Sequence, residues 1–255
     1  MIDNNVILDV KSVSKNFGAL KAVDQVTFQV KKGEIVGLIG PNGAGKTTLT
    51  NLVTNDLTKT HGQVFFKGQN ITNLKTYQIA LIGLTRTYQV VKPLEGMTVE
   101  ENVLVGSLFG RGGRNNDLIH AKRRAKEIME LVGLDEKKDQ LVSDITLPDL
   151  KRMEFARVLA MDPEVIFLDE VMAGLNPSEV EETSRLVKKI RKEKMLTIVY
   201  IEHIMKAVMG ISDRVIVLHH GKKIVEGSPQ EVVNNPAVIE AYLGKKYAKE
   251  VVNNK

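Results

Sequence analysis

A glycine-rich segment at residues 40–48 carries the clearest chemical signal in the chain. Its residues satisfy the pattern G-x-x-x-x-G-K-[ST] in full: Gly40-Pro41-Asn42-Gly43-Ala44-Gly45-Lys46-Thr47-Thr48. An apolar run at residues 35–39 precedes it, and a helical pattern follows it. Glycines let successive backbone N–H groups point into one concavity that binds phosphate oxygens, and the following helix dipole adds positive potential. The segment therefore predicts a triphosphate-binding loop, in which Lys46 reaches the β- and γ-phosphates and Thr47 ligates Mg²⁺.

Two adjacent acids form the second chemical feature. Asp169 and Glu170 directly follow four apolar residues, 165–168, which are typical of a buried strand. Taken alone, the pair is more often two solvated acids at the end of a strand. Beside a complete phosphate-binding loop, we expect Asp169 to belong to the Mg²⁺ shell and Glu170 to act as general base on an attacking water.

The elements that must position these groups predict an α/β fold. Residues 26–30 alternate apolar and polar side chains, which indicates a half-buried strand in a β-rich first third. Wholly apolar runs recur at residues 165–168, 196–201 and 215–218, and a helical pattern covers residues 178–194. Such runs suit a mostly parallel sheet that is covered on both faces.

We expect one domain with a helical subdomain at about residues 83–151 and a short basic tail at residues 245–255. Residues 107–116 contain three glycines and are predicted to form a flexible loop. A stripe at helical spacing follows and ends at Gly133; its members are Leu118, Ala121, Ala125, Ile128, Met129 and Val132. Basic residues off this stripe are interpreted as a solvated helix face.

Composition restricts the remaining function classes. The chain has 255 residues, no cysteine and a formal net charge of +5. Disulfide scaffolds and cysteine-based zinc sites are therefore excluded. No apolar run is long enough to span a membrane, and the first residues do not resemble a signal peptide, so a cytoplasmic location is expected. The sequence pI near 9.2 comes from dispersed charges, and we predict no nucleic-acid partner.

Further motifs identify the kind of nucleotide-binding protein. The chain has no N/T-K-x-D motif, which reads guanine in GTPases, so a GTPase is disfavoured. A small-molecule kinase would share the phosphate-binding loop but would not explain three further segments. Residues 86–89 resemble a Q-loop, residues 173–176 resemble a D-loop with Asn176 in place of the usual aspartate, and residues 201–203 resemble a switch-histidine segment. In this order, with Phe17 upstream, they resemble the ATP-binding-cassette (ABC) ATPases.

That resemblance implies a set of residue roles. It implies that Phe17 stacks on the adenine of ATP and that residues 40–48 hold its phosphates. Mg²⁺ would be held by Thr47, Gln89 and Asp169. The catalytic set would be Glu170, Gln89 and His203, with His203 contacting the γ-phosphate.

The finer resemblance is to the ATPases of branched-chain amino-acid importers, and to the longer of the two that such importers use. It rests on residues 13–23, 83–89, 97–106 and 238–244. It implies a second ATPase subunit in a hetero- or homodimer, membrane-spanning permease subunits and, indirectly, a solute-binding protein. The chain would then be peripheral, on the cytoplasmic face of the membrane. Lipid exporters share much of the pattern, so export stays an alternative, as do non-transport cassettes and a regulatory ATP-binding module.

One motif departs from the family. Where L-S-G-G-Q is usual, the chain has Ile145-Thr146-Leu147-Pro148-Asp149. Pro148 has no N–H to donate, and Asp149 would bring negative charge toward a triphosphate. The spacing of Thr146 and Asp149 is also that of a helix capping box. We therefore expect a stable helix start that binds phosphate poorly, and an asymmetric pair of ATP sites in a dimer.

Overall fold

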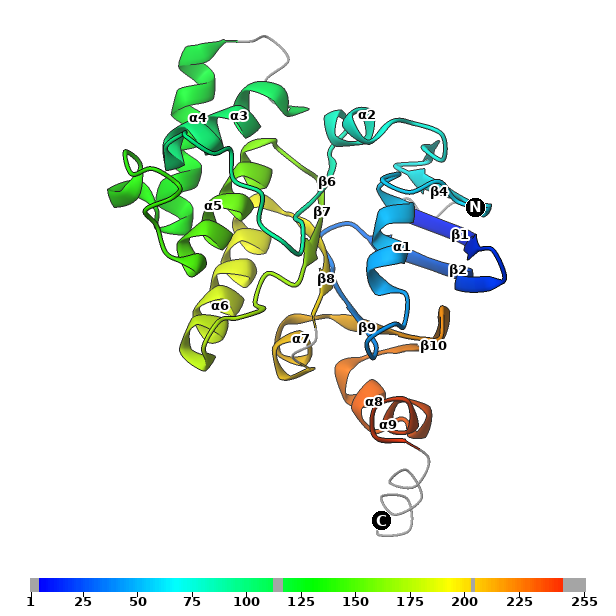
Figure 1. Cartoon of the computed structure of the whole chain (residues 1–255). Coiled ribbons are helices and arrows are strands. Elements are labelled where there is room, and N and C mark those ends of the chain that lie inside the picture. The colour runs from blue at the N-terminus through cyan, green and yellow to red at the C-terminus, as the bar shows by residue number, and fades with distance from the viewer. Residues whose placement is uncertain (1–4, 112–116, 203–204, 245–255) are drawn as a thin grey trace. The chain divides into compact units, whose positions relative to one another are not determined.

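The chain forms two compact units in the computed structural model, which describes residues 5–111, 117–202 and 205–244 (Figure 1). Unit 1 comprises Met1–Leu74 and Thr197–Lys255, and unit 2 comprises Lys75–Leu196. Both units combine strands with helices, as the sequence patterns predict for an α/β protein.

The described elements fall into these two units as follows. Unit 1 contains β1 (Val6–Phe17), β2 (Leu20–Lys31), β3 (Ile35–Ile39), α1 (Lys46–Val53), β4 (His61–Phe66), β5 (Gln69–Asn70), β8 (Thr197–Ile201), α7 (Met205–Ile211), β9 (Arg214–His219), β10 (Lys222–Gly227), α8 (Pro229–Val233) and α9 (Pro236–Leu243). Unit 2 contains α2 (Thr76–Leu81), β6 (Leu84–Arg86), α3 (Val99–Phe109), α4 (Leu118–Val132), the 3-10 helix η2 (Asp135–Lys137), α5 (Leu147–Ala160), β7 (Val165–Asp169) and α6 (Pro177–Lys194).

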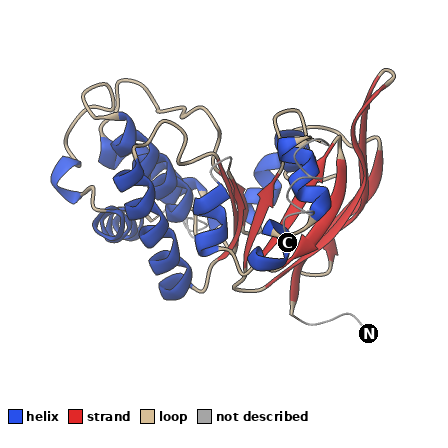
Figure 2. Cartoon of the chain, turned by 90° about the horizontal axis from the view of Figure 1, so that it is seen from below, coloured by secondary structure: helices blue, strands red, loops and turns tan. Residues whose placement is uncertain are grey.

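An antiparallel sheet with the strand order β2-β1-β4-β5 makes up the N-terminal part of unit 1. Figure 2 draws the strands of the chain in red. In β2 the side chains of Val26, Phe28 and Val30 are buried, whereas Thr27 and Gln29 between them are exposed. This is the alternation expected of a strand with one face on the core. The predicted antiparallel β region is confirmed.

Strand β3 pairs in parallel with β8 on one side and with β9 on the other, and β10 pairs antiparallel with β9. Every residue of β3 and of β8 is buried, which explains why their sequences are almost wholly apolar. The register places Ile39 opposite Val217. The end of β3, where the glycine-rich loop begins, therefore lies beside the end of β9.

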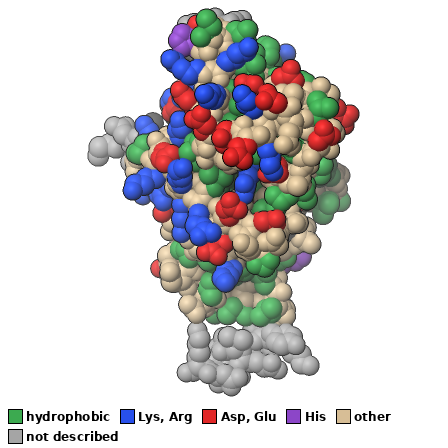
Figure 3. All heavy atoms as spheres, turned by 90° about the vertical axis from the view of Figure 1, so that its left-hand side faces the viewer, with side chains coloured by type: hydrophobic (Ala, Val, Ile, Leu, Met, Phe, Trp, Pro, Cys, Tyr) green, Lys and Arg blue, Asp and Glu red, His purple; other side chains and the backbone are tan. Residues whose placement is uncertain are grey.

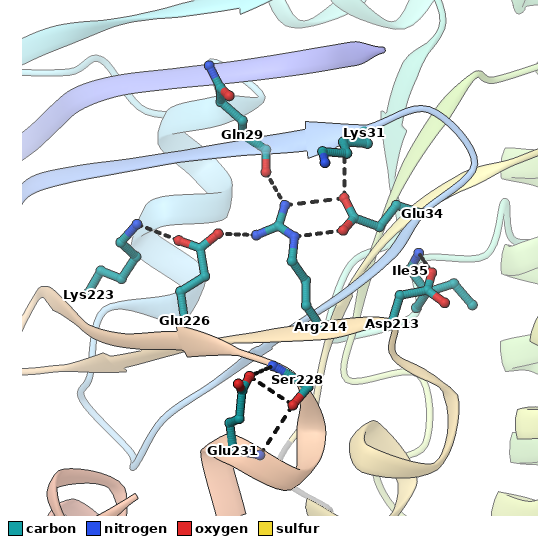
Figure 4. Close-up of polar contacts among 10 residues, drawn as sticks. All are labelled: Gln29, Lys31, Glu34, Ile35, Asp213, Arg214, Lys223, Glu226, Ser228 and Glu231. Atoms are coloured by element: carbon teal, nitrogen blue, oxygen red, sulfur yellow. Dashed lines mark hydrogen bonds and ion pairs between the residues drawn. The ribbon is translucent and has the colours of Figure 1, made fainter. Parts of the chain in front are cut away.

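A network of charged side chains centred on Arg214 fastens the start of β9 within unit 1 (Figure 4). The Arg214 guanidinium donates to the carboxylate of Glu34 at 2.6 and 3.2 Å, and also bonds Glu226 and the carbonyl oxygen of Gln29. Lys223 adds a bond of 2.5 Å to Glu226. Bidentate pairing of this kind fixes geometry as well as adding energy. It joins β9, β10 and the segment between β2 and β3.

Helices α3, α4 and α5 pack against one another in unit 2, and β6 pairs in parallel with β7. Helix α4 begins at its N-cap Asp117 and ends at Gly133, whose φ of 72° suits a C-terminal glycine. The predicted stripe on α4 is buried except for Leu118, which is 50% exposed. The predicted helix and its stop are confirmed, and Leu118 is the first residue of the helix.

The predicted flexible loop begins later than expected. Helix α3 continues through residues 107–109, so the first three positions assigned to the loop are helical. Residues 112–116 lie outside the described part of the chain. The limits proposed for the helical subdomain, 83–151, stay a prediction; α5 extends beyond them to Ala160.

Basic and acidic side chains are interspersed on the face that Figure 3 shows. On α4, Arg123 and Glu127, and likewise Lys126 and Glu130, form pairs at 3.9 Å, one helical turn apart. Pairs at this spacing are typical of a solvated helix face. Arg123 and Lys126 of α4 are therefore explained by local ion pairs.

Candidate functional site

The glycine-rich loop of unit 1 connects the buried strand β3 to helix α1, as the motif requires. Gly40, Gly43 and Gly45 have φ values of 155°, 76° and 100°, which residues with a side chain rarely adopt. A Cβ at position 40 would lie 2.2 Å from the carbonyl oxygen of Leu218, and one at position 45 would lie 2.6 Å from that of Ala22. The loop thus depends on glycine for both its dihedral angles and its close packing.

The first turn of α1 offers its polar groups to a ligand. Gly45 is the N-cap and provides no side-chain cap, and the first turn contains no acidic residue. Thr47 is exposed and Thr48 is half-buried. Backbone N–H groups at such a helix start favour an anion. The observed geometry therefore fits a phosphate group.

Lys46 is buried and its ammonium lies against the loop. Its Nζ donates to the carbonyl oxygens of Gly40 at 2.7 Å and Pro41 at 3.2 Å. These contacts hold a positive charge on the loop. A triphosphate would supply anionic oxygens to the same ammonium. Asn42 and Gly43, at the tip of the loop, are exposed, whereas Ala44 is buried.

Phe17 is the last residue of β1, in the same unit. Its ring is 50% exposed and lies 5.1 Å from the ammonium of Lys15. The role of this half-exposed ring toward adenine stays a prediction.

The acidic pair of unit 2 follows β7, whose five residues are all buried. Asp169 forms an ion pair with Arg86 at 3.0 Å, and both side chains are almost fully buried. The backbone N–H of Asp169 donates to the Thr87 hydroxyl at 3.0 Å. Buried charges need such partners. The sequence pattern identified Asp169, but it gave no indication of its pairing with Arg86, 83 residues away.

Glu170 and Gln89, which the sequence proposed separately, are brought together. The Gln89 side-chain amide donates to the Glu170 carboxylate at 2.6 Å. Glu170 has a φ of 52°, a strained value for a residue with a side chain that commonly marks functional sites. Its backbone is held by Lys151 of α5, whose ammonium donates to the carbonyls of Glu170, at 3.4 Å, and Ala173.

Lys151 and Glu154 are the residues that sequence reasoning missed. Glu154 is 3% exposed and accepts the backbone N–H of Tyr88, next to Gln89, at 3.3 Å. Burial raises the pKa of Glu154 to about 6, against the opposing effect of the Tyr88 hydrogen bond and nearby cations. The only sequence signal for their burial was the apolar residues that surround them. Helix α5 is buried on more than one face, so these two charged residues are buried with their apolar neighbours.

The departing segment, residues 145–149, forms the start of α5. Thr146 is the N-cap, and its hydroxyl donates to the Asp149 carboxylate at 2.6 Å. Asp149 also pairs with Lys137, and it is 6% exposed. Burial opposes the charge of Asp149, yet the bonds from Lys137 and Thr146 outweigh it and lower its pKa. The predicted helix cap at Thr146 is confirmed, and the Asp149 carboxylate binds the Thr146 hydroxyl rather than its backbone N–H as in a capping box.

Two site predictions stay open for different reasons. His203 lies outside the described residues. Among the residues that the structure describes, no cluster of three or more His, Cys, Asp or Glu side chains could hold a metal ion by itself. The Thr47 hydroxyl in unit 1 and the Asp169 carboxylate in unit 2 are each an oxygen donor of the kind Mg²⁺ accepts, and their joint role stays a prediction.

Comparisons with known proteins bear on the whole chain. The ABC transporter family model matches residues 23–173, and that of the branched-chain amino acid ATP-binding cassette transporter matches residues 222–248. The chain is 40% identical to the high-affinity branched-chain amino acid transport ATP-binding protein LivG of Escherichia coli K12, over 94% of this chain and 98% of the relative. It is 36% identical to BraF of Pseudomonas aeruginosa over the same shares of the two chains.

Solved structures agree with these sequence matches. A nucleotide-free ATP-binding cassette from an ABC transporter superposes with a TM-score of 0.84 at 31% identity, covering 94% of this chain and all of the other. The ADP conformation of MJ1267, an ATP-binding cassette of an ABC transporter, gives the same TM-score and identity, covering 94% of this chain and 99% of the other.

No helix within the described ranges is both long and apolar enough to cross a membrane. The phosphate-binding loop, the fold and the family matches lead to one assignment. The chain belongs to the ABC transporter family, as an ATP-binding cassette with the fold of an ABC ATPase.

Proposed function

We propose that this chain is the ATP-hydrolysing subunit of a transporter that takes up branched-chain amino acids. The observation that carries the proposal is the similarity to LivG over 94% of the chain, together with the branched-chain family match at residues 222–248. A complete phosphate-binding loop and the acidic pair after β7 supply the chemistry. A related small solute, or export of a lipid, is the alternative.

The proposed roles follow the groups described above. Phe17 holds adenine, and residues 40–48 hold the phosphates through backbone N–H groups and the Lys46 ammonium. Glu170 accepts a proton from the attacking water, and Gln89, 2.6 Å from its carboxylate, orients that carboxylate. His203 contacts the γ-phosphate. Thr47, Gln89 and Asp169 would hold Mg²⁺, which offsets negative charge on the phosphates.

The chain would work in an assembly. We infer a second ATPase subunit, identical or different, two permease subunits that cross the membrane, and a solute-binding protein that delivers the solute. The chain then lies at the cytoplasmic face of the membrane through its partners. ATP binding closes the pair of cassettes, and hydrolysis releases them, so catalysis is mainly positioning and charge neutralisation.

Uptake by the reconstituted complex tests the proposal. Vesicles that contain the complex and the solute-binding protein should accumulate labelled leucine, isoleucine or valine when MgATP is supplied on the cassette side. Glu170→Gln should leave ATP binding unchanged but lower ATP turnover and uptake about 100-fold or more, because the general base is lost. Lys188→Gln, an exposed change on α6, is the control. Full turnover by the Glu170→Gln complex would contradict the role given to Glu170.

A further inference from the structure

Residues 88–97 lie between β6 and α3 in unit 2 and carry Gln89 near their beginning. They form no helix or strand. Val90 is 71% exposed and Leu94 is 37% exposed, so burial of apolar side chains holds the segment only weakly. Other contacts must therefore fix its backbone if Gln89 is to stay 2.6 Å from the Glu170 carboxylate.

A buried asparagine of α3 binds this segment at Leu94. The side-chain oxygen of Asn102 accepts the N–H of Leu94 at 2.8 Å, and its amide nitrogen donates to the Leu94 carbonyl at 3.2 Å. The same nitrogen donates to the Thr98 carbonyl at 3.0 Å, and the same oxygen accepts a bond from the Arg157 guanidinium at 3.3 Å. These four bonds use both donors and both lone pairs of the asparagine side chain. Asn102 therefore fixes both polar groups of the Leu94 backbone.

Two side chains of α5 bind the same segment closer to Gln89. The Arg157 guanidinium, which also bonds the α3 asparagine, donates to the carbonyl oxygen of Lys92 at 2.9 Å. Glu154, three residues earlier on α5, accepts the N–H of Tyr88 at 3.3 Å. Side chains from two helices thus hold the backbone of the segment at three points, one of them directly beside Gln89.

Close packing of α3 on α5 brings these side chains together (Figure 1). Gly106 lies one turn after Asn102 on α3, and a Cβ there would be 2.1 Å from the Arg157 carbonyl oxygen. One turn further, a Cβ on Gly110 would be 2.3 Å from the Cα of Met161. Glycines four residues apart therefore let the two helix backbones approach each other closely. The two helices form a common support for the segment.

We propose that Asn102 and Arg157 are positioning residues of the ATP site. They hold residues 88–94 on α3 and α5, and the segment in turn keeps Gln89 against Glu170. The inference rests on the roles proposed for Gln89 and Glu170 in ATP hydrolysis. Asn102 and Arg157 act through the backbone of the segment and not on the nucleotide.

The test is ATP turnover of the assembled transporter carrying Arg157→Met, which keeps an unbranched side chain but removes its hydrogen-bond donors. The value of kcat should fall about tenfold, while KM for ATP stays within about twofold because the phosphate-binding loop is unchanged. Arg185→Met, at a side chain of α6 that is 71% exposed, should leave both constants unchanged. A wild-type kcat in Arg157→Met would overturn the inference.

A double substitution separates positioning from general stabilisation. If Arg157 acts through Gln89, then Arg157→Met should lower kcat less than about twofold in a complex that already carries Gln89→Ala. A further tenfold loss in that complex would show that Arg157 acts by another route, and it would overturn the inference.

Amide hydrogen exchange of the full chain reports on the segment itself. In nucleotide-free Arg157→Met, and likewise in Asn102→Ala, the backbone amides of residues 88–92 should exchange faster, while those of β1 and β2 keep the wild-type rate. Unchanged exchange at residues 88–92 would contradict the proposed support.

A milder variant serves where Arg157→Met does not assemble. Arg157→Lys keeps the charge but replaces the guanidinium fork by a single nitrogen, which cannot serve both acceptors in the same geometry. We expect kcat to fall about threefold in this variant, and a wild-type kcat would then overturn the inference.

Glu170→Gln distinguishes failure of this inference from failure of the proposed function. Loss of turnover in Glu170→Gln, together with wild-type turnover in Arg157→Met, would reject the positioning role alone. Full turnover in Glu170→Gln would reject the proposed catalytic site, and the positioning role with it.

Discussion

Two helices in this chain, α1 and α5, differ in whether a side chain caps the backbone N–H groups of their first turn. Helix α1 begins after Gly45 without a side-chain cap and without an acid in its first turn. Helix α5 begins after Thr146, which caps it, and carries Asp149 in its first turn. The first start is available to an anion, whereas the second is satisfied and negatively charged by its own side chains. A phosphate-binding helix start thus requires the absence of the groups that would otherwise stabilise it.

The largest expected effect is on ATP turnover, when the two ATP sites of an assembled dimer are inactivated one at a time. If the start of α5 binds phosphate poorly, turnover depends mainly on the site formed by this chain's own loop. Glu170→Gln should then lower ATP turnover of the complete transporter about 100-fold or more, and the matching substitution in the other cassette should lower it less than about twofold. Single-turnover ATPase measurements on the two mutant complexes make this comparison. Equal losses would show that both sites are used alike.

The next effect concerns the buried acid in the middle of α5. Because burial raises the pKa of Glu154 to about 6, above its ordinary value of 4.5, the folded chain binds more protons than the unfolded chain between these pH values. Wild-type stability should therefore rise, relative to Glu154→Gln, as the pH falls from 7 to 4, by up to about 2 kcal/mol. Urea unfolding at several pH values measures the difference. A difference that does not vary with pH would contradict the raised pKa.

A smaller effect on the free energy of unfolding, with the opposite dependence on pH, is expected from Asp149 in the first turn of the same helix. Replacing Asp149 by Asn removes the charge that pairs with Lys137 and should reduce the free energy of unfolding at pH 7 by about 1 kcal/mol. Since the pKa of Asp149 is lowered from 3.8, the difference between the wild type and Asp149→Asn should persist above that pH and disappear as the acid is protonated below it. Asp144→Asn, at an exposed position, is the control.

Local patterns account for what the sequence could predict. The phosphate-binding loop lies within nine consecutive residues, and the strand before Asp169 is a continuous apolar run, so spacing alone located them. The stop of α4 at Gly133 was predictable for the same reason. Helical periodicity placed Leu118 on α4, but it did not show that this first residue is half exposed.

Contacts between distant segments account for what was missed. Lys151 reaches the carbonyl of Glu170 across 19 residues, and Glu154 meets Tyr88 across 66. No periodicity encodes such pairings, because they depend on the packing of α5 against the strand ends. Charged residues inside a buried helix are the general indication that partners of this kind exist.

The pairing of β3 determines when its sheet can form during synthesis of the chain. Both neighbours of β3, namely β8 and β9, lie in the last quarter of the sequence, and Arg214 at the start of β9 completes the attachment. Domains generally fold as units during synthesis. Unit 2 is a continuous stretch that leaves the ribosome whole, whereas unit 1 must keep the apolar β3 unpaired until its C-terminal strands emerge. The loop that binds the nucleotide is therefore translated early but acquires its supports last.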